Sequence, residues 1–424
     1  MNERLLQYIW QFQHYNTNEL RTTEGEKIRI IHQGQFNTNQ GADFLNAKLQ
    51  IGPHTLVGNV ELHVLSSDWF RHKHDKDPNY HNVILHVVWE DDLKADAIKR
   101  FPTLVLENRV PRVLLSQHAR WQKSQNSIPC GKQLLDTSEL VWKQWKERLL
   151  VERLGRKNEM LLQWLDKNNA DWEEILWWVI ARSYGIPVNG DAFLAIAASV
   201  SWRIMQRHAG SLIQVEAMLF GQAGLLDDDV PDDDYFNKLK EEYGYLRGLH
   251  AFERVNIPVL FLRMRPSSFP TVRLAQLATM VHHTAARLRS LIESDSFKTV
   301  KRMLGVPADG YWNDHYIFGE VGSMGAKKPG GQMIDNILIN AVVPFMFAFG
   351  EYHANHEYIS RAVEWMYQLR AENNHAIRPY LDMGVGCKSA ADTQALLELK
   401  LNYCNTRRCL ECAVGVDLLQ RTKT

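Results

Sequence analysis

The sequence predicts an α+β protein in which an N-terminal mixed sheet is followed by a larger all-α domain. Up to about residue 110 apolar residues alternate or form short runs, as in half-buried and buried strands. Beyond about residue 115 they recur at helical spacing. A chain of 424 residues is also long for one hydrophobic core. We therefore expect two domains, residues 1–114 and 115–424.

The first part is expected to begin with a helix and to continue with strands. Leu5, Leu6, Ile9 and Trp10 give the helix its apolar face. Turn signals at Glu24-Gly25 and Gly52-Pro53 separate the strands. The strand-like segments are residues 27–32, 44–51, 56–64, 83–88 and one or two short runs between 100 and 114.

The second part is expected to be helical throughout. Residues 136–139, Asp-Thr-Ser-Glu, resemble a helix start, and apolar residues follow at helical spacing to residue 150. The same spacing returns in residues 172–180 and 274–281. The tryptophans of these segments are interpreted as core residues between helices.

Composition indicates a protein of the cytoplasm. The N-terminus lacks a basic region followed by an apolar stretch, and no apolar run is long enough to span a membrane, so no membrane association is expected. Five cysteines, an odd number, do not suggest a disulfide scaffold. The formal net charge of zero argues against a surface coated with nucleic acid, although one basic groove remains compatible with it.

Three residues able to bind metal interrupt the predicted strands. Asp43 opens the second strand, and Glu61 and His63 lie on the third. Residues two apart on a strand face the same side, so Glu61 and His63 are expected to converge with Asp43. Two carboxylates and an imidazole suit a divalent ion, which activates water for phosphodiester hydrolysis.

This order of elements and acids resembles the PD-(D/E)XK nuclease superfamily. Asp43 matches its first acid and Glu61 its second, while His63 stands where the motif has lysine and Ala42 where it has proline. The resemblance implies a restriction-endonuclease-like sheet, catalytic roles for Asp43, Glu61 and His63, Mg²⁺ or Mn²⁺ as cofactor, and DNA or RNA as partner. It points to no particular protein partner.

Longer strings identify a second resemblance, which covers nearly the whole chain. The chain is similar to an uncharacterised bacterial family, catalogued as domain of unknown function 2851, which brings no known reaction. The strings include residues 33–37 (QGQFN), 41–44 (GADF), 58–63 (GNVELH), 83–88 (VILHVV), 128–130 (IPC) and 220–224 (FGQAG).

A histidine-rich segment follows the third strand. His72 and His74 are expected to bind substrate or to add ligands, and an acid on or after the first helix, Glu19, to support them. Together with His63 they also suit a zinc-dependent hydrolase acting on a small phosphate or amide. A polar surface turn is the third interpretation, and His86 is interpreted as a hydrogen-bonded core histidine.

Two further groups are candidates. The C-terminal cysteines Cys404, Cys409 and Cys412, with Cys387 as fourth ligand and Cys130 as a more distant choice, suit zinc or an iron–sulfur cluster. Some nucleases of the resembled superfamily carry such clusters. Arg263, Arg265 and Arg273 surround a predicted helix start and are candidates for substrate binding.

The leading hypothesis is thus a metal-dependent nuclease whose helical part binds substrate or partner. The alternatives are the zinc hydrolase and a catalytically inactive scaffold that is structural or binds nucleic acid.

Overall fold

The computed structural model describes residues 1–93, 101–167, 171–228, 230, 232–262, 264–284, 287–308 and 310–421. These residues divide into two compact units, which we describe separately. The first comprises Met1–Trp145, Asp382–Val385 and Leu399–Thr424, and the second Lys146–Leu381 and Gly386–Glu398. Residue 114, where the sequence places the domain boundary, lies within the first unit.

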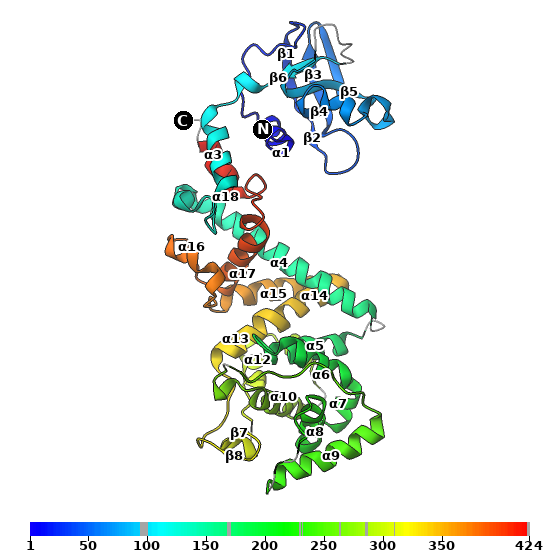
Figure 1. Ribbon diagram of the computed structural model, residues 1–424, viewed down its shortest axis with the longest axis vertical. Coiled ribbons are helices and arrows are strands. Elements are labelled where there is room, and N and C mark those ends of the chain that lie inside the picture. The colour runs from blue at the N-terminus through cyan, green and yellow to red at the C-terminus, as the bar shows by residue number, and fades with distance from the viewer. Residues whose placement is uncertain are drawn as a thin grey trace. The chain divides into compact units, whose positions relative to one another are not determined.

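The first unit is built on a six-stranded mixed sheet with the order β1-β3-β4-β5-β6, while β2 pairs with β3 (Figure 1). The β1–β3 and β3–β4 pairs are antiparallel, and the β4–β5 and β5–β6 pairs are parallel. The strands are β1 (Ile28–His32), β2 (Gln35–Phe36), β3 (Phe44–Ile51), β4 (His54–Leu65), β5 (Val83–Glu90) and β6 (Thr103–Val105).

Helices and short turns complete this unit. The helix α1 (Glu3–Gln11) buries Leu5, Leu6, Ile9 and Trp10, as its apolar spacing predicts, and both α1 and α2 (Asp68–Arg71) contact β4. Between α2 and β5 lie the 3₁₀ turns η1 (His74–Lys76) and η2 (Pro78–Tyr80). The remaining elements are η3 (Glu107–Arg109), α3 (Arg112–Lys123), η4 (Gly131–Asp136), the π-helical turn η9 (Lys400–Cys404) and α18 (Ala413–Gln420).

The second unit is mostly helical, and α4 (Glu139–Lys167) and α17 (Ala390–Leu399) each run from one unit into the other along the chain. Its longer helices are α5 (Trp172–Gly185), α6 (Gly190–Ser199), α8 (Leu212–Gln222), α9 (Asp234–His250), α10 (Pro270–Thr284), α14 (Val343–Tyr352) and α15 (His356–Gln368). The shorter ones are α7 (Trp202–His208), α11 (Ser290–Glu293), α12 (Phe297–Leu304), α13 (Gly331–Ile337) and α16 (Arg378–Asp382), with turns η5 (Pro266–Ser268), η6 (Gly310–Asn313), η7 (Leu338–Val342) and η8 (His375–Ile377).

The architecture confirms the predicted α+β class, with one addition. The second unit contains a small antiparallel hairpin of β7 (His315–Ile317) and β8 (Glu320–Val321), whereas the sequence predicts helices throughout. The two-residue turn Phe318-Gly319 joins the strands, and Gly319 adopts a φ of 73°, which glycine tolerates best. This short turn signal escapes a search based on apolar periodicity.

One helical stretch of the second unit is apolar enough to resemble a membrane span. It runs over Gly331–Tyr352, through α13, η7 and α14, with a mean hydropathy of 1.6, and it is the one such helix among the described residues. About two thirds of it, 67%, is buried inside the protein. Packing within the core therefore accounts for its composition.

The parallel pair β4–β5 requires a glycine at residue 58. A Cβ atom there would lie 2.5 Å from Ile84 Cγ2 and 2.6 Å from the carbonyl oxygen of Asn82. Since Asn59 N–H donates to that same carbonyl, the backbone has little freedom to move away. We expect Gly58→Ala to destabilise the pair by about 1–3 kcal/mol and to speed amide hydrogen exchange in β4 and β5 at least about tenfold.

The matched control is Gly155→Ala in α4, where a Cβ atom meets nothing within 4 Å. This variant should leave exchange in β4 and β5 unchanged. Unchanged exchange in Gly58→Ala as well would show that the sheet accommodates the methyl group, contrary to the prediction.

Candidate metal centre

Asp43 and Glu61 are brought together where β3 begins beside β4. The backbone N–H of Asp43 donates to Glu61 Oε2 at 3.0 Å, and the backbone N–H of Leu62 donates to Asp43 Oδ2 at 3.0 Å. From α1, Gln7 Nε2 donates to Asp43 Oδ1 at 2.7 Å. Each carboxylate is thus fixed by hydrogen bonds that span two strands, as the strand order predicts.

His63 lies on the same face of β4 as Glu61. Its Nε2 is 3.7 Å from Glu61 Oε1, and its side chain is 1% exposed. The other ring nitrogen, Nδ1, lies 2.9 Å from Nε2 of His86, which sits opposite Glu61 in the register of the parallel pair. When His63 Nδ1 carries the proton of this hydrogen bond, His63 Nε2 keeps a lone pair on the side of Glu61 and His72. His86 is therefore the buried, hydrogen-bonded histidine that the sequence suggests, and its partner belongs to the site.

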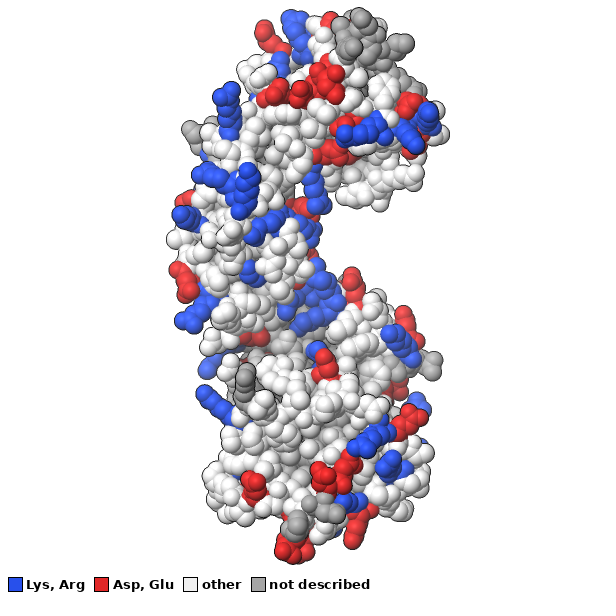
Figure 2. All heavy atoms as spheres, in the orientation of Figure 1, with Lys and Arg blue, Asp and Glu red and all other residues white. Residues whose placement is uncertain are grey.

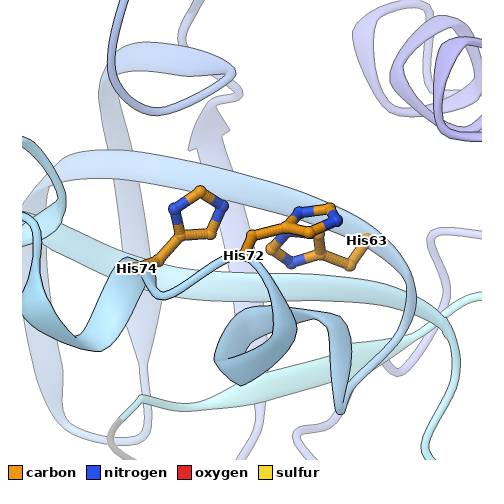
Figure 3. A group of neighbouring side chains, drawn as sticks. All are labelled: His63, His72 and His74. Atoms are coloured by element: carbon orange, nitrogen blue, oxygen red, sulfur yellow. The ribbon is translucent and has the colours of Figure 1, made fainter.

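His72 and His74 come to the same place from the segment between β4 and β5 (Figure 3). His72 ends α2, His74 begins η1, and Lys73 between them adopts a left-handed φ of 61°. His72 Nδ1 lies 3.2 Å from His63 Nε2, and His74 Nε2 lies 3.5 Å from Glu61 Oε1. One ligand atom from each of the three histidines lies within 4.8 Å of the others.

Three of the separations between neighbouring donor atoms are close to those around a tetrahedral ion. Metal–nitrogen bonds of about 2.0–2.1 Å place tetrahedral ligand atoms about 3.3 Å apart. The observed distances between neighbouring donor atoms run from 3.2 Å to 3.7 Å. Nitrogen and carboxylate donors of this kind are typical zinc ligands and also suit manganese.

Burial sets the charge of the site. It raises the pKa of Glu61, which the neighbouring Asp43 carboxylate raises further, and it also raises the pKa of Asp43. Burial, and then the neighbouring His86, His74 and His72, lower the pKa of His63 to about 2. Burial also lowers the pKa of His74. The imidazoles of His63 and His74 are thus neutral and able to offer lone pairs to a metal.

Tyr80 is a member of the site to which the sequence assigned no role. Its ring stacks on that of His74, with 3.8 Å between the ring centroids, and its hydroxyl donates to the carbonyl oxygen of Gly41 at 3.4 Å. Burial, then the Glu61 and Asp43 carboxyls, raise its pKa to about 12. Tyr80 therefore holds the His74 ring against the loop that carries Asp43.

The acid expected near the first helix differs from the residue suggested. Glu19 lies in the loop after α1, exposed, with its backbone carbonyl oxygen accepting from Arg109 at 3.2 Å. Glu3, on α1 itself, is the acid whose charge raises the pKa of both Asp43 and Glu61.

The candidate arginines belong to the second unit. Arg263 lies outside the described residues, and Arg265 precedes η5. Arg273 is on α10, where it donates to Gln276 Oε1 at 3.1 Å and to Ser268 Oγ at 3.3 Å, and burial lowers its pKa. Arg273 thus makes hydrogen bonds within its own helix and to the preceding turn η5.

The cysteines divide differently from the expected set. Cys404, Cys409 and Cys412 are buried in the first unit together with Cys130. Cys387 belongs to the second unit, where its charged neighbours are Asp392, Lys146 and Glu372. The structure thus groups Cys130, rather than Cys387, with the C-terminal three.

Comparison with known proteins identifies one family. The family model described as "Protein of unknown function (DUF2851)" matches residues 3–375. No curated protein and no solved structure matches the chain. The matched region contains the whole histidine and carboxylate site and ends before the C-terminal cysteines.

The buried carboxyl of Glu61 predicts a pH-dependent stability in chelator-treated protein. Because its folded pKa is raised above the usual 4.5, its contribution is fully present below pH 4.5 and is lost as the pH rises. Glu61→Gln removes this loss, so the variant should melt at a higher temperature than wild type above neutral pH and at a similar temperature near pH 4.

Thermal melting from about pH 4, near the usual carboxyl pKa, up to about pH 9 measures this difference. Glu24→Gln, at an exposed acid of the same unit, should follow wild type throughout. Parallel curves for wild type and Glu61→Gln would contradict the raised pKa.

Proposed function

The chain belongs to the DUF2851 family, and we propose that it is a metal-dependent hydrolase that cleaves phosphodiester bonds of nucleic acid. The observation that carries the proposal is the convergence of Glu61, His63, His72 and His74, whose neighbouring donor atoms lie 3.2–3.7 Å apart. They stand beside Asp43 at the point where the nuclease resemblance expects its acids.

The donor set fits a divalent ion held by His63, His72 and His74, with Glu61 Oε1 beside His63 and His74 as a further donor. Such an ion supplies a bound water of lowered pKa and neutralises charge on the scissile phosphate. Mg²⁺ prefers oxygen ligands, so three imidazoles favour Zn²⁺ or Mn²⁺ over the Mg²⁺ that the sequence suggests.

The protein's own residues orient this site. The N–H of Asp43 holds Glu61, Gln7 holds Asp43, and His86 fixes the ring of His63. His72 is exposed, whereas His63 is buried, so a substrate reaches the site from the side of His72. Asp43 acts in this proposal as a positioning residue for Glu61.

Nucleic acid is the proposed substrate for two reasons. The order α1, three antiparallel strands, α2 and the parallel strand β5 is the order on which the nuclease resemblance rests. In addition, exposed Arg71, Lys73 and Lys76 flank the two loop histidines and suit phosphate. On the face in Figure 2, basic and acidic side chains are interspersed, in keeping with a local rather than a general phosphate-binding surface.

A zinc-dependent hydrolase of a small phosphate or amide is the second candidate. Three histidine ligands with one further position for water are typical of catalytic zinc sites. For either reaction we propose the cytoplasm as its location, since the five cysteines are free.

Metal binding is the first expected property. In chelator-treated protein, Zn²⁺ or Mn²⁺ should bind by calorimetric titration more tightly than Mg²⁺. Glu61→Gln and His74→Ala should each weaken this binding about 10- to 100-fold or more, because the first removes the negative charge of the carboxylate and the second removes a donor nitrogen. His81→Ala, at an exposed histidine of the same segment, should bind as wild type does. Equal affinity in all four proteins would exclude this site.

Hydrolysis is the second expected property. Wild type should cleave labelled single- or double-stranded DNA or RNA with Mn²⁺ or Zn²⁺. Asp43→Asn should lower the rate about 100-fold or more, because an amide has one acceptor oxygen and cannot accept from both Leu62 N–H and Gln7 Nε2, which loosens the backbone that holds Glu61. Glu24→Gln serves as the control. Equal cleavage by wild type and Asp43→Asn would assign the activity to a contaminant. Cleavage of a small phosphate ester or amide alone would favour the zinc hydrolase, and no turnover of any of these would favour a scaffold.

A further inference from the structure

Four of the five cysteines gather in one buried region of the first unit, away from the function proposed above. Cys130 precedes η4, Cys404 ends η9, Cys409 follows in a loop, and Cys412 precedes α18. All four are buried and none is in a disulfide. Two segments more than 270 residues apart in the sequence therefore supply thiols to one place.

Several hydrogen bonds join these two segments. The guanidinium of Arg407 donates to the carbonyl oxygens of Cys404 at 2.8 Å and Ser124 at 2.6 Å, while Gln122 Nε2 donates to the carbonyl oxygen of Arg407 at 3.1 Å. Lys400 Nζ donates to the carbonyl oxygen of Ser127. The helix α18 also contacts both α3 and η4, so the turns that carry Cys130 and Cys412 lie side by side.

A glycine brings the cysteine loop onto α18. A Cβ atom at Gly415 would lie 2.2 Å from the carbonyl oxygen of Cys409, so only glycine permits this approach. Arg407, in the same loop, adopts a left-handed φ of 58°. The close approach at Gly415 and the left-handed Arg407 therefore hold the loop with Cys404 and Cys409 against the start of α18, which Cys412 precedes.

The four thiols interact electrostatically as a group. Burial raises the pKa of Cys130, and Cys412, Cys404 and Cys409 each raise it further. Burial likewise raises the pKa of Cys412, with added contributions from Cys404 and Cys409. Each thiol thus lies within the electrostatic range of the others.

Positive charge surrounds the group. Arg407 favours the thiolate of Cys409, and the backbone amides of Gly415 and Val414, in the first turn of α18, favour that of Cys412. Cys404 interacts electrostatically with Lys400. Such surroundings suit a centre in which four thiolates carry negative charge, whereas buried cysteines that merely fill space need none of them.

The distances between the sulfur atoms distinguish a mononuclear zinc site from a polynuclear cluster. In a mononuclear zinc site, bonds of about 2.3 Å place the four sulfurs about 3.8 Å apart. Among the described residues, no three of the cysteine sulfurs lie within 4.8 Å of one another, so they are more widely spread than a mononuclear zinc site requires. A wider spacing suits a polynuclear cluster.

We propose that Cys130, Cys404, Cys409 and Cys412 bind an iron–sulfur cluster, and that Cys387 is not a ligand. Each thiol loses its proton when its sulfur binds iron, and iron and sulfide come from solution or from a cluster donor. The cluster joins the C-terminal segment to η4, which gives it a structural role independent of the hydrolase site.

The test uses the full chain, purified under anaerobic conditions or reconstituted with ferrous iron and sulfide. Wild type is expected to be brown, with iron and acid-labile sulfide in similar amounts. Cys130→Ser should lose most of the iron, at least about fivefold, because a cluster with three thiolates is held weakly. Cys387→Ser, the matched control, should keep it.

A measurement on wild type alone guards against variants that fail to fold. Cluster-loaded protein should show slower amide exchange in residues 404–412 than protein stripped with an iron chelator, because the cluster ties this loop to η4. A colourless protein with five titratable thiols, zinc in place of iron, or iron lost from Cys387→Ser but not from Cys130→Ser would each overturn the proposal.

Discussion

The reciprocal hydrogen bonds between Asp43 and Glu61 are the interaction on which the site depends. The β3–β4 ladder is interrupted between Phe44 and Ala47, where Asn46 adopts a φ of 57°. Asn46 N–H there donates to Asn59 Oδ1, and Phe44–Val60 is the last pair of this ladder, so the amides of Asp43 and Leu62 beyond it need other acceptors. The two carboxylates supply them, since Glu61 accepts from Asp43 N–H and Asp43 from Leu62 N–H. Both carboxylates therefore accept hydrogen bonds from the backbone of the sheet, whatever reaction they also serve.

The histidines extend this arrangement through the parallel half of the sheet. The register of β4 and β5 places His86 opposite Glu61, within reach of His63. The connection between the two strands then returns His72 and His74 to the same face. One antiparallel junction and one parallel crossover therefore deliver a complete donor set from a short stretch of chain.

The sequence predicted those features of the site that depend on local pattern. The strands, α1, and the placement of Asp43, Glu61 and His63 follow from alternation and from spacing along one strand. The contributions of Gln7 and Tyr80 depend on how α1 and η2 pack, and no local pattern shows this.

The cysteines illustrate the same limit. Cys387 is nearer in sequence to Cys404, yet the structure assigns it to the other unit and brings Cys130 from the far end of the chain. Cysteines that are close in sequence can share a ligand set only when they belong to the same unit. Which unit a residue joins depends on how the chain packs, and the sequence pattern does not show this.

The discontinuous composition of the first unit has a consequence for biosynthesis. Residues 399–424 are translated after the entire second unit, although they belong to the first. The ribosome therefore releases a second unit able to fold while the first still lacks its last segment, including α18 and three of the buried thiols. A nascent first unit exposes the surface that α18 later covers, so chaperone engagement is expected to concentrate on this part of the chain until synthesis ends.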